Sequence, residues 1–112
     1  MKLEERDDIL VEHMLDCIAR IEKYLPDGEK QFFASDLVQD AVVRNLQTLA
    51  ESSQRLSTES KRSQPEIDWR AIAGFRNILV HDYMGLDLSL IWLVVEKELP
   101  LLKRALGELR QR

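Results

Sequence analysis

The sequence predicts an all-α fold, a compact antiparallel bundle of four to five helices. Apolar residues recur at three- and four-residue intervals over long stretches, a spacing that places them on one face of an α-helix. No stretch shows the strict apolar–polar alternation of a half-buried strand. Proline, glycine and short polar runs separate the helical stretches, and the 112 residues fit a single domain spanning residues 1–112.

The first predicted helix covers about residues 3–25 and ends at the Pro-Asp-Gly sequence of residues 26–28. A short helical turn at residues 29–34 is expected to lay Phe32 and Phe33 on the core. The apolar face of the first helix consists of Leu3, Leu10, Met14, Cys17, Ile18, Ile21 and Leu25.

The second long helix is predicted from Asp36 to about Thr58, with Ser35 as its N-cap. Asn45 falls on its inner face and should be hydrogen-bonded, to the backbone or to the third long helix. Residues 57–65 are polar and are expected to form a mobile loop. The inner face consists of Val38, Ala41, Val42, Asn45, Leu46, Leu49, Ser53 and Leu56.

The third long helix is predicted to open at Pro65 and Asp68, with Asp68 as its N-cap. The glycine-containing sequence that follows makes a helix end near His81 plausible. Asp87 should cap the final helix, whose apolar face contains Ile91, Trp92 and Val95. Pro100 should kink that helix or start a new segment, because it lacks a backbone donor.

Composition excludes several functional classes. Hydrophobic residues make up 45% of the chain, yet no apolar run approaches the roughly eighteen residues that span a bilayer. The charged N-terminus has no signal-peptide core, so a cytoplasmic protein is expected. The net charge of −4 argues against a general nucleic-acid coat protein but leaves room for a local basic cleft. The single cysteine, Cys17, is expected to be buried and permits no disulfide framework or thiolate metal site.

An arginine, an asparagine, a histidine and a tyrosine crowd into residues 76–83 of the third helix, within an apolar stretch. Burying Arg76 unpaired would cost several kcal/mol. Asn77 and His81 are one helical turn apart, so the amide can orient the imidazole. Tyr83 lies seven residues beyond Arg76 and nearly shares its face. Arg76 and His81 are about 140° apart around the axis. One straight helix cannot aim both at one small group, so the helix ends near His81, or a second copy contributes, or both.

This pattern of Arg, Asn, three residues, His, one residue and Tyr resembles the signature of the HEPN superfamily, and specifically of the HepT-like toxins of bacteria and archaea. The resemblance covers nearly the whole chain. Where the family usually has Gly-Glu-Ala, this chain has Ala50, Glu51 and Ser52, so the glutamate is retained. The other residues that carry the resemblance are Leu37–Val42, Asn45–Leu46, Ile67–Arg70, Gly85–Asp87, Trp92 and Glu98–Lys103.

The resemblance implies a ribonuclease with Arg76 and His81 as catalytic residues. Metal-free RNA cleavage needs a base, an acid and a cation near the phosphate. His81 is suited to proton transfer at neutral pH, and Arg76 can grip two phosphate oxygens at once. Asn77 can fix the imidazole or donate to phosphate. One chain offers only one such histidine, which favours a homodimer with a shared cleft. The chain lacks a clustered ligand set, so no metal or other cofactor is expected.

The resemblance also implies a partner. HepT-like proteins are toxins of a type II/VII-like toxin–antitoxin pair, silenced by a small nucleotidyltransferase antitoxin that transfers AMP to the motif tyrosine, here Tyr83. Without the resemblance, Tyr83 reads as a core-edge ring with a solvated hydroxyl. The alternative function is a non-catalytic module, either nucleotide-binding or the obligate partner subunit of a minimal nucleotidyltransferase.

A polar stripe runs along another face of the second long helix, comprising Arg44, Thr48, Glu51 and Arg55. One interpretation is a solvated face with intrahelical ion pairs. The other is a polar wall of the cleft, in which Glu51 is a supporting residue that orients Arg76 or a ribose hydroxyl. The sequence leaves both open.

Overall fold

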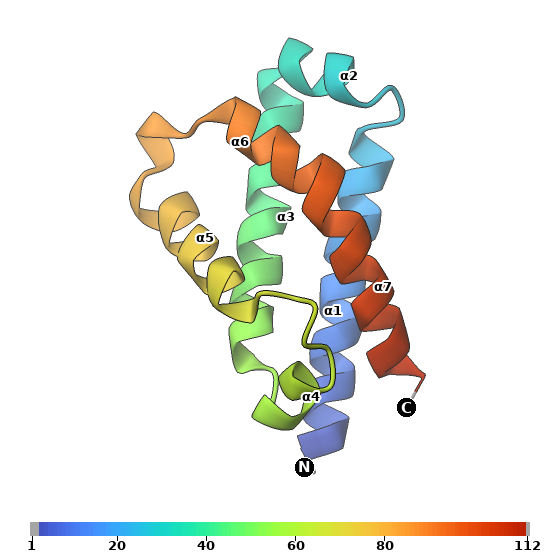
Figure 1. Cartoon of the computed structure of the whole chain (residues 1–112). Coiled ribbons are helices and arrows are strands. Elements are labelled where there is room, and N and C mark those ends of the chain that lie inside the picture. Colours follow the sequence, from blue (N-terminus) through green and yellow to red (C-terminus); the bar gives the residue numbers. More distant parts are fainter. Residues whose placement is uncertain (1–2, 112) are drawn as a thin grey trace.

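The computed structural model describes residues 3–111, and the side chains of residues 3–5 and of Tyr83 lie outside the described part. Every regular element within that range is helical, which confirms the all-α class (Figure 1). The elements are α1 (Leu3–Tyr24), α2 (Glu29–Ala34), α3 (Asp36–Arg55), α4 (Thr58–Arg62), α5 (Trp69–His81), the 3₁₀ turn η1 (Tyr83–Gly85), α6 (Leu88–Leu93), the π segment η2 (Val94–Glu98) and α7 (Leu99–Arg110).

The two longest helices, α1 and α3, lie antiparallel at the centre of the bundle (Figure 1). Helix α7 packs on α1, whereas α5 packs mainly on α3. The α6–η2–α7 segment faces α5 across an apolar groove. No helix in the described range is long and apolar enough to cross a membrane.

The helix caps lie where the sequence predicts them. Gly28 precedes α2 with a positive φ of 69°, a conformation that glycine adopts without steric cost. The Ser35 hydroxyl accepts a hydrogen bond from the Val38 amide at 3.2 Å and caps α3. Within α3, the buried Asn45 side chain donates to the Ala41 carbonyl at 2.9 Å. Of the two hydrogen-bond partners predicted for Asn45, the backbone and the third long helix, the backbone is the one observed.

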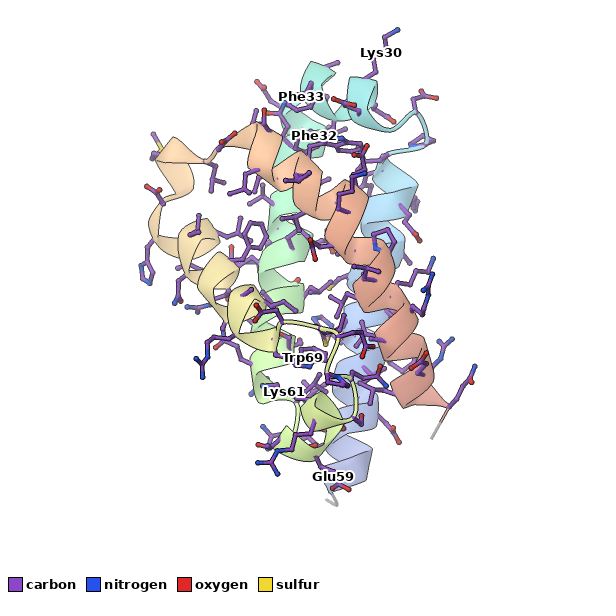
Figure 2. The ribbon with its side chains drawn as sticks, viewed as in Figure 1. Lys30, Phe32, Phe33, Glu59, Lys61 and Trp69 are labelled. Atoms are coloured by element: carbon purple, nitrogen blue, oxygen red, sulfur yellow. The ribbon has the colours of Figure 1, made fainter. Side chains whose placement is uncertain are left out.

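Only one of the two adjacent phenylalanines reaches the core. Phe32 is fully buried and its ring lies 5.7 Å from that of Trp92, whereas Phe33 is 41% exposed (Figure 2). The prediction that α2 lays both rings on the core is wrong for Phe33. Successive residues on a helix differ by about 100° in direction, so a short helix cannot turn both inward.

The final helix is interrupted at the predicted place. Asp87 accepts hydrogen bonds from the Ser89 and Leu90 amides and caps α6. The Leu99 amide bonds back to the Val94 carbonyl, which makes η2 a π-type turn, and α7 follows with Pro100 in its first turn. Because Pro100 has no N–H, the regular bonding pattern cannot continue through it.

The prediction of a mobile loop at residues 57–65 is wrong, because Thr58–Arg62 form α4. The buried Asp7 carboxylate on α1 accepts hydrogen bonds from the Ser57 hydroxyl at 2.5 Å, the Ser57 amide at 3.1 Å and the Ser60 hydroxyl at 2.6 Å. Trp69 closes the other side, where its indole N–H donates to the Lys61 carbonyl at 3.1 Å (Figure 2). These contacts fix the segment from which α5 starts.

Replacing Asp7 with asparagine should make the free energy of unfolding less dependent on pH in the acidic range. Burial alone raises the pKa of Asp7, but the bonds from Ser57 and Ser60 and the nearby Arg6 outweigh it and lower that pKa overall. A lowered folded-state pKa means that ionised Asp7 adds stability above the unfolded value near 4, and that this stability is lost as pH falls through the folded value. We expect Asp7→Asn to lose about 1–2 kcal/mol at pH 7 and less at pH 3, measured by urea unfolding.

The exposed neighbour provides the control for this experiment. Asp8 is exposed on the same helix, so Asp8→Asn should change the free energy of unfolding by at most about 0.5 kcal/mol. An Asp7→Asn protein with the same deficit at pH 3 as at pH 7 would contradict the proposed role of the Asp7 carboxylate.

Candidate active site

Helix α5 carries the polar motif and is defined at both ends. The Asp68 carboxylate accepts a hydrogen bond from the Ala71 amide at 2.9 Å, so it is the predicted N-cap. The helix ends at His81, where the Asp82 amide donates to the Ile78 carbonyl at 3.0 Å. The predicted helix end near His81 is therefore confirmed, and the chain continues through the 3₁₀ turn η1.

Arg76 lies in a chain of polar contacts between α5 and α3. Its Nη2 atom is 3.6 Å from Glu51 Oε1, and its Nη1 atom donates to the Asn77 side-chain oxygen at 3.3 Å. Glu51 Oε1 also accepts a hydrogen bond from Gln47 Nε2 at 3.3 Å. The contact of Glu51 with Arg76 is one of the two roles that the sequence leaves open for Glu51.

The Arg76 guanidinium has donors that no described residue uses. The Arg76 side chain is 30% exposed and that of Glu51 41%, so both reach solvent along the seam between the two helices. Arg76 Nε is buried and has no hydrogen-bond partner in the described part of the chain. A planar group with several N–H donors, of which few are used, is well suited to bind an oxyanion.

His81 is exposed at the end of α5. No described side chain lies within hydrogen-bond distance of its ring, and Asn77 accepts from Arg76 instead of orienting the imidazole. The residue is five positions beyond Arg76, which corresponds to about 140° around the helix and about 7.5 Å along it. Arg76 is thus directed at α3, and His81 stands apart from that contact.

Tyr83 begins the 3₁₀ turn η1, two residues beyond His81. Its side chain lies outside the described residues, so the role assigned to its hydroxyl stays a prediction. Its neighbour Met84 is 96% exposed, which places this turn at the surface.

The polar stripe of α3 is divided between two directions. Arg44 and Arg55 are exposed, and Glu51 turns to Arg76. Thr48, in contrast, donates to the backbone and lies 3.4 Å from the Sγ atom of the buried Cys17 on α1. The stripe is therefore not one continuous wall. Gln47 was not anticipated, although its i, i+4 spacing to Glu51 could have indicated the contact.

An apolar groove of about 660 Å³ opens on the other side of α5. It is bounded by α3, α5 and the α6–η2–α7 segment. Three of its apolar lining residues are substantially exposed, namely Ile78 at 42%, Leu90 at 39% and Leu101 at 48%. Contiguous exposed apolar surface of this kind commonly marks an interaction site. Ile78 lies between Arg76 and His81 in the sequence, so the groove adjoins the motif.

No group of three or more His, Cys, Asp or Glu side chains gathers in a metal-binding arrangement within the described residues.

Comparison with known proteins gives a consistent set of matches. Residues 14–109 match the family model described as "Ribonuclease HepT-like". A Methanocaldococcus jannaschii protein named "Gamma-glutamylcyclotransferase and putative RNase" is 40% identical over 96 residues, which cover 85% of this chain and 43% of that protein. A Thermococcus cleftensis protein named "Probable ribonuclease HepT" is 32% identical over 112 residues, covering 99% of this chain and 100% of its own. No solved structure matches.

Proposed function

This chain belongs to the HepT-like ribonuclease family, and we propose that it is a metal-independent endoribonuclease that cleaves RNA by transesterification. The observation that carries the proposal is the arrangement on α5. Arg76 is held by Glu51 and Asn77 with unused donors, and the exposed His81 stands at the helix end. A fixed guanidinium and an accessible imidazole are two of the three groups that metal-free phosphodiester cleavage requires near the phosphate.

Each residue has a role set by its chemistry. Arg76 binds the non-bridging phosphate oxygens and stabilises the charge that accumulates on the pentacoordinate phosphorus. Histidine exchanges protons near neutral pH, so His81 carries one of the two proton transfers. Asn77 and Glu51 are supporting residues that contact the guanidinium. The second proton transfer needs a group other than the one histidine that the motif offers.

We further propose that the active form is a homodimer. Arg76 is directed at α3 while His81 lies about 140° around α5, so an arginine from one copy and a histidine from the other fit a shared cleft better than two from one chain. The groove beside α5, with Ile78, Leu90 and Leu101 exposed, supplies an apolar face for a second copy. A two-fold axis would place the same face of both copies in contact and generate two equivalent sites.

The proposed control is the addition of AMP to Tyr83 by a nucleotidyltransferase antitoxin, as in a toxin–antitoxin pair. What supports it is the position of Tyr83 in the surface turn after α5, two residues beyond His81. A phosphodiester-linked nucleotide adds a negative charge and bulk at that place. Repulsion of the RNA phosphate and simple occlusion would then act in the same direction.

Replacing Tyr83 with phenylalanine should leave RNA cleavage largely intact but remove silencing. Without the phenol there is no acceptor for AMP, so the variant should stay active when incubated with the antitoxin and ATP, whereas the unmodified protein should lose its activity. Mass spectrometry should find one added AMP on the wild-type chain and none on the variant. If the variant is silenced equally and neither chain gains AMP, inhibition works by binding alone.

The reaction itself is tested by the ends of the RNA products. A transesterification without metal leaves a 2′,3′-cyclic phosphate and a 5′-hydroxyl, and should proceed at an undiminished rate in excess EDTA. A non-catalytic nucleotide-binding subunit would release neither end. Complete inhibition by EDTA with recovery on adding magnesium would reject the proposed mechanism.

A further inference from the structure

The proposed reaction leaves one proton unaccounted for in each site. The 2′-hydroxyl must lose a proton as it attacks, and the 5′-oxygen must gain one as it leaves. The motif provides one histidine for these two transfers. Resting on the proposed ribonuclease function, we propose that Glu51 is the general base that takes the proton of the 2′-hydroxyl, with His81 as the acid.

The position of the Glu51 carboxylate is the first argument. Its Oε1 atom lies 3.6 Å from Arg76 Nη2 and accepts a hydrogen bond from Gln47 at 3.3 Å. Its Oε2 atom accepts no hydrogen bond from any residue in the described range. The carboxylate is therefore fixed through one oxygen, while the other remains available, on a side chain that is 41% exposed.

The geometry of a nucleotide is the second argument. The 2′-hydroxyl that attacks and the phosphate that is attacked belong to neighbouring positions of the same ribose. A carboxylate in contact with the guanidinium that binds this phosphate is consequently close to the 2′-hydroxyl as well. An ionised carboxylate only accepts hydrogen bonds, so an O–H group is a suitable ligand for it and an RNA phosphate is not.

Helix direction is the third argument. Glu51 and Arg76 face one another across the α3–α5 seam, and His81 is about 140° away around α5. The base and the phosphate-binding cation then come from one copy and the acid from the other. An in-line displacement requires acid and base on opposite sides of the phosphorus, an arrangement that groups from two copies can supply.

The chemical step balances with these groups. Glu51 takes the proton of the 2′-hydroxyl, and the 2′-oxygen forms a bond to phosphorus. The bond between phosphorus and the 5′-oxygen breaks, and the protonated His81 imidazole gives its proton to that oxygen. The products are a 2′,3′-cyclic phosphate and a 5′-hydroxyl. Water returns the proton from Glu51 to His81, so no proton is consumed overall.

A substrate with a good leaving group separates the base from the acid. In uridine 3′-(p-nitrophenyl phosphate) the leaving group is p-nitrophenolate, which needs no proton. His81→Ala should therefore lose most of its activity on RNA and regain much of it on this substrate. Glu51→Gln should be slower than the wild type by about 10²–10⁴-fold on both substrates, because both need the 2′-hydroxyl deprotonated.

Two further variants test whether the effect of Glu51→Gln comes from the loss of the carboxylate. Glu51→Asp keeps a carboxylate and should retain more activity than Glu51→Gln. Glu12 forms a comparable ion pair with Arg110 at 3.5 Å, on α1 and α7, so Glu12→Gln is the matched control and should cleave as fast as the wild type. Binding of RNA with a 2′-deoxy sugar at the scissile position should change by less than about two-fold in Glu51→Gln, because general bases act on the rate rather than on ground-state binding.

The outcomes are distinguishable. An active wild type together with a Glu51→Gln variant of similar kcat overturns the inference alone. A Glu51→Gln variant that loses RNA affinity but keeps kcat assigns Glu51 to the positioning of Arg76 and likewise overturns it. A wild-type protein that cleaves neither substrate overturns the proposed ribonuclease function and this inference with it.

Discussion

Replacing either His81 or Arg76 with alanine is expected to abolish RNA cleavage and leave the fold intact. Removing a cation that stabilises transition-state charge costs about 10²–10³-fold in rate, or about 3–4 kcal/mol. Losing the group that transfers a proton costs about 10²–10⁴-fold. His81 is exposed and Arg76 is 30% exposed, so neither change creates a cavity in the core. Initial rates on a defined RNA test the loss of cleavage, and circular dichroism at matched concentrations tests whether the fold is intact.

The chain supplies its own controls for this pair. His13 is the other histidine of the chain and lies exposed on α1, so His13→Ala should cleave normally. Arg70 is an exposed arginine on the same helix as Arg76, and Arg70→Ala should retain far more activity than Arg76→Ala. Undiminished cleavage by the His81→Ala protein would reject the mechanism outright.

Arg76→Lys refines the interpretation of the arginine. Lysine keeps the positive charge but cannot place two N–H groups on two phosphate oxygens in a fixed plane. The contact with Glu51 could persist, so the variant should fold and bind RNA. A rate close to that of Arg76→Ala would show that the geometry of the guanidinium matters, whereas a rate close to the wild type would show that its charge suffices.

Mixing two inactive variants should restore activity if the site is shared between copies. In a heterodimer of an Arg76→Ala chain and a His81→Ala chain, one site carries both defects and the other carries neither. Random exchange of equal amounts makes half of the dimers heterodimers with one intact site in two, so about a quarter of the wild-type activity should return. Each variant refolded with itself should stay inactive.

The pairing pattern tests which residues share a chain within one site. A Glu51→Gln chain mixed with a His81→Ala chain should also recover activity. A Glu51→Gln chain mixed with an Arg76→Ala chain should not, because each site would then lack one of two groups that come from the same copy. A protein that is fully active as a monomer, at concentrations where sedimentation shows no association, would exclude the shared site.

The groove beside α5 offers an independent test of the dimer. Ile78 is 42% exposed on α5 and adjoins the motif, so Ile78→Glu should weaken self-association without unfolding the monomer. Leu37 is 80% exposed at the start of α3, which makes Leu37→Glu the matched control. If Ile78→Glu lowers activity and dimer content in parallel, and Leu37→Glu lowers neither, the groove is supported as the interface.

The sequence by itself determined the long helices and the residues of the candidate motif. Apolar periodicity gives the buried face of each helix, and the caps at Ser35, Asp68 and Asp87 follow from side-chain oxygens placed to accept first-turn amide protons. The burial of Cys17 follows from its place on the apolar face of α1. The motif of Arg76, Asn77, His81 and Tyr83 could also be identified from the sequence, because local spacing alone places side chains that are one or two helical turns apart.

Only the tertiary structure decided which side chains meet. The Asp7 carboxylate lies 50 residues from its partner Ser57 in the sequence. Their contact holds the segment that forms α4, where the sequence predicted a loop. Arg76 met Glu51 of α3, and Asn77 turned to Arg76 rather than to His81. Helical period specifies the direction of a side chain around its own axis, whereas contacts between helices depend on the distance, crossing angle and axial offset at which they pack. Those three quantities arise from the whole core at once, and no local pattern contains them.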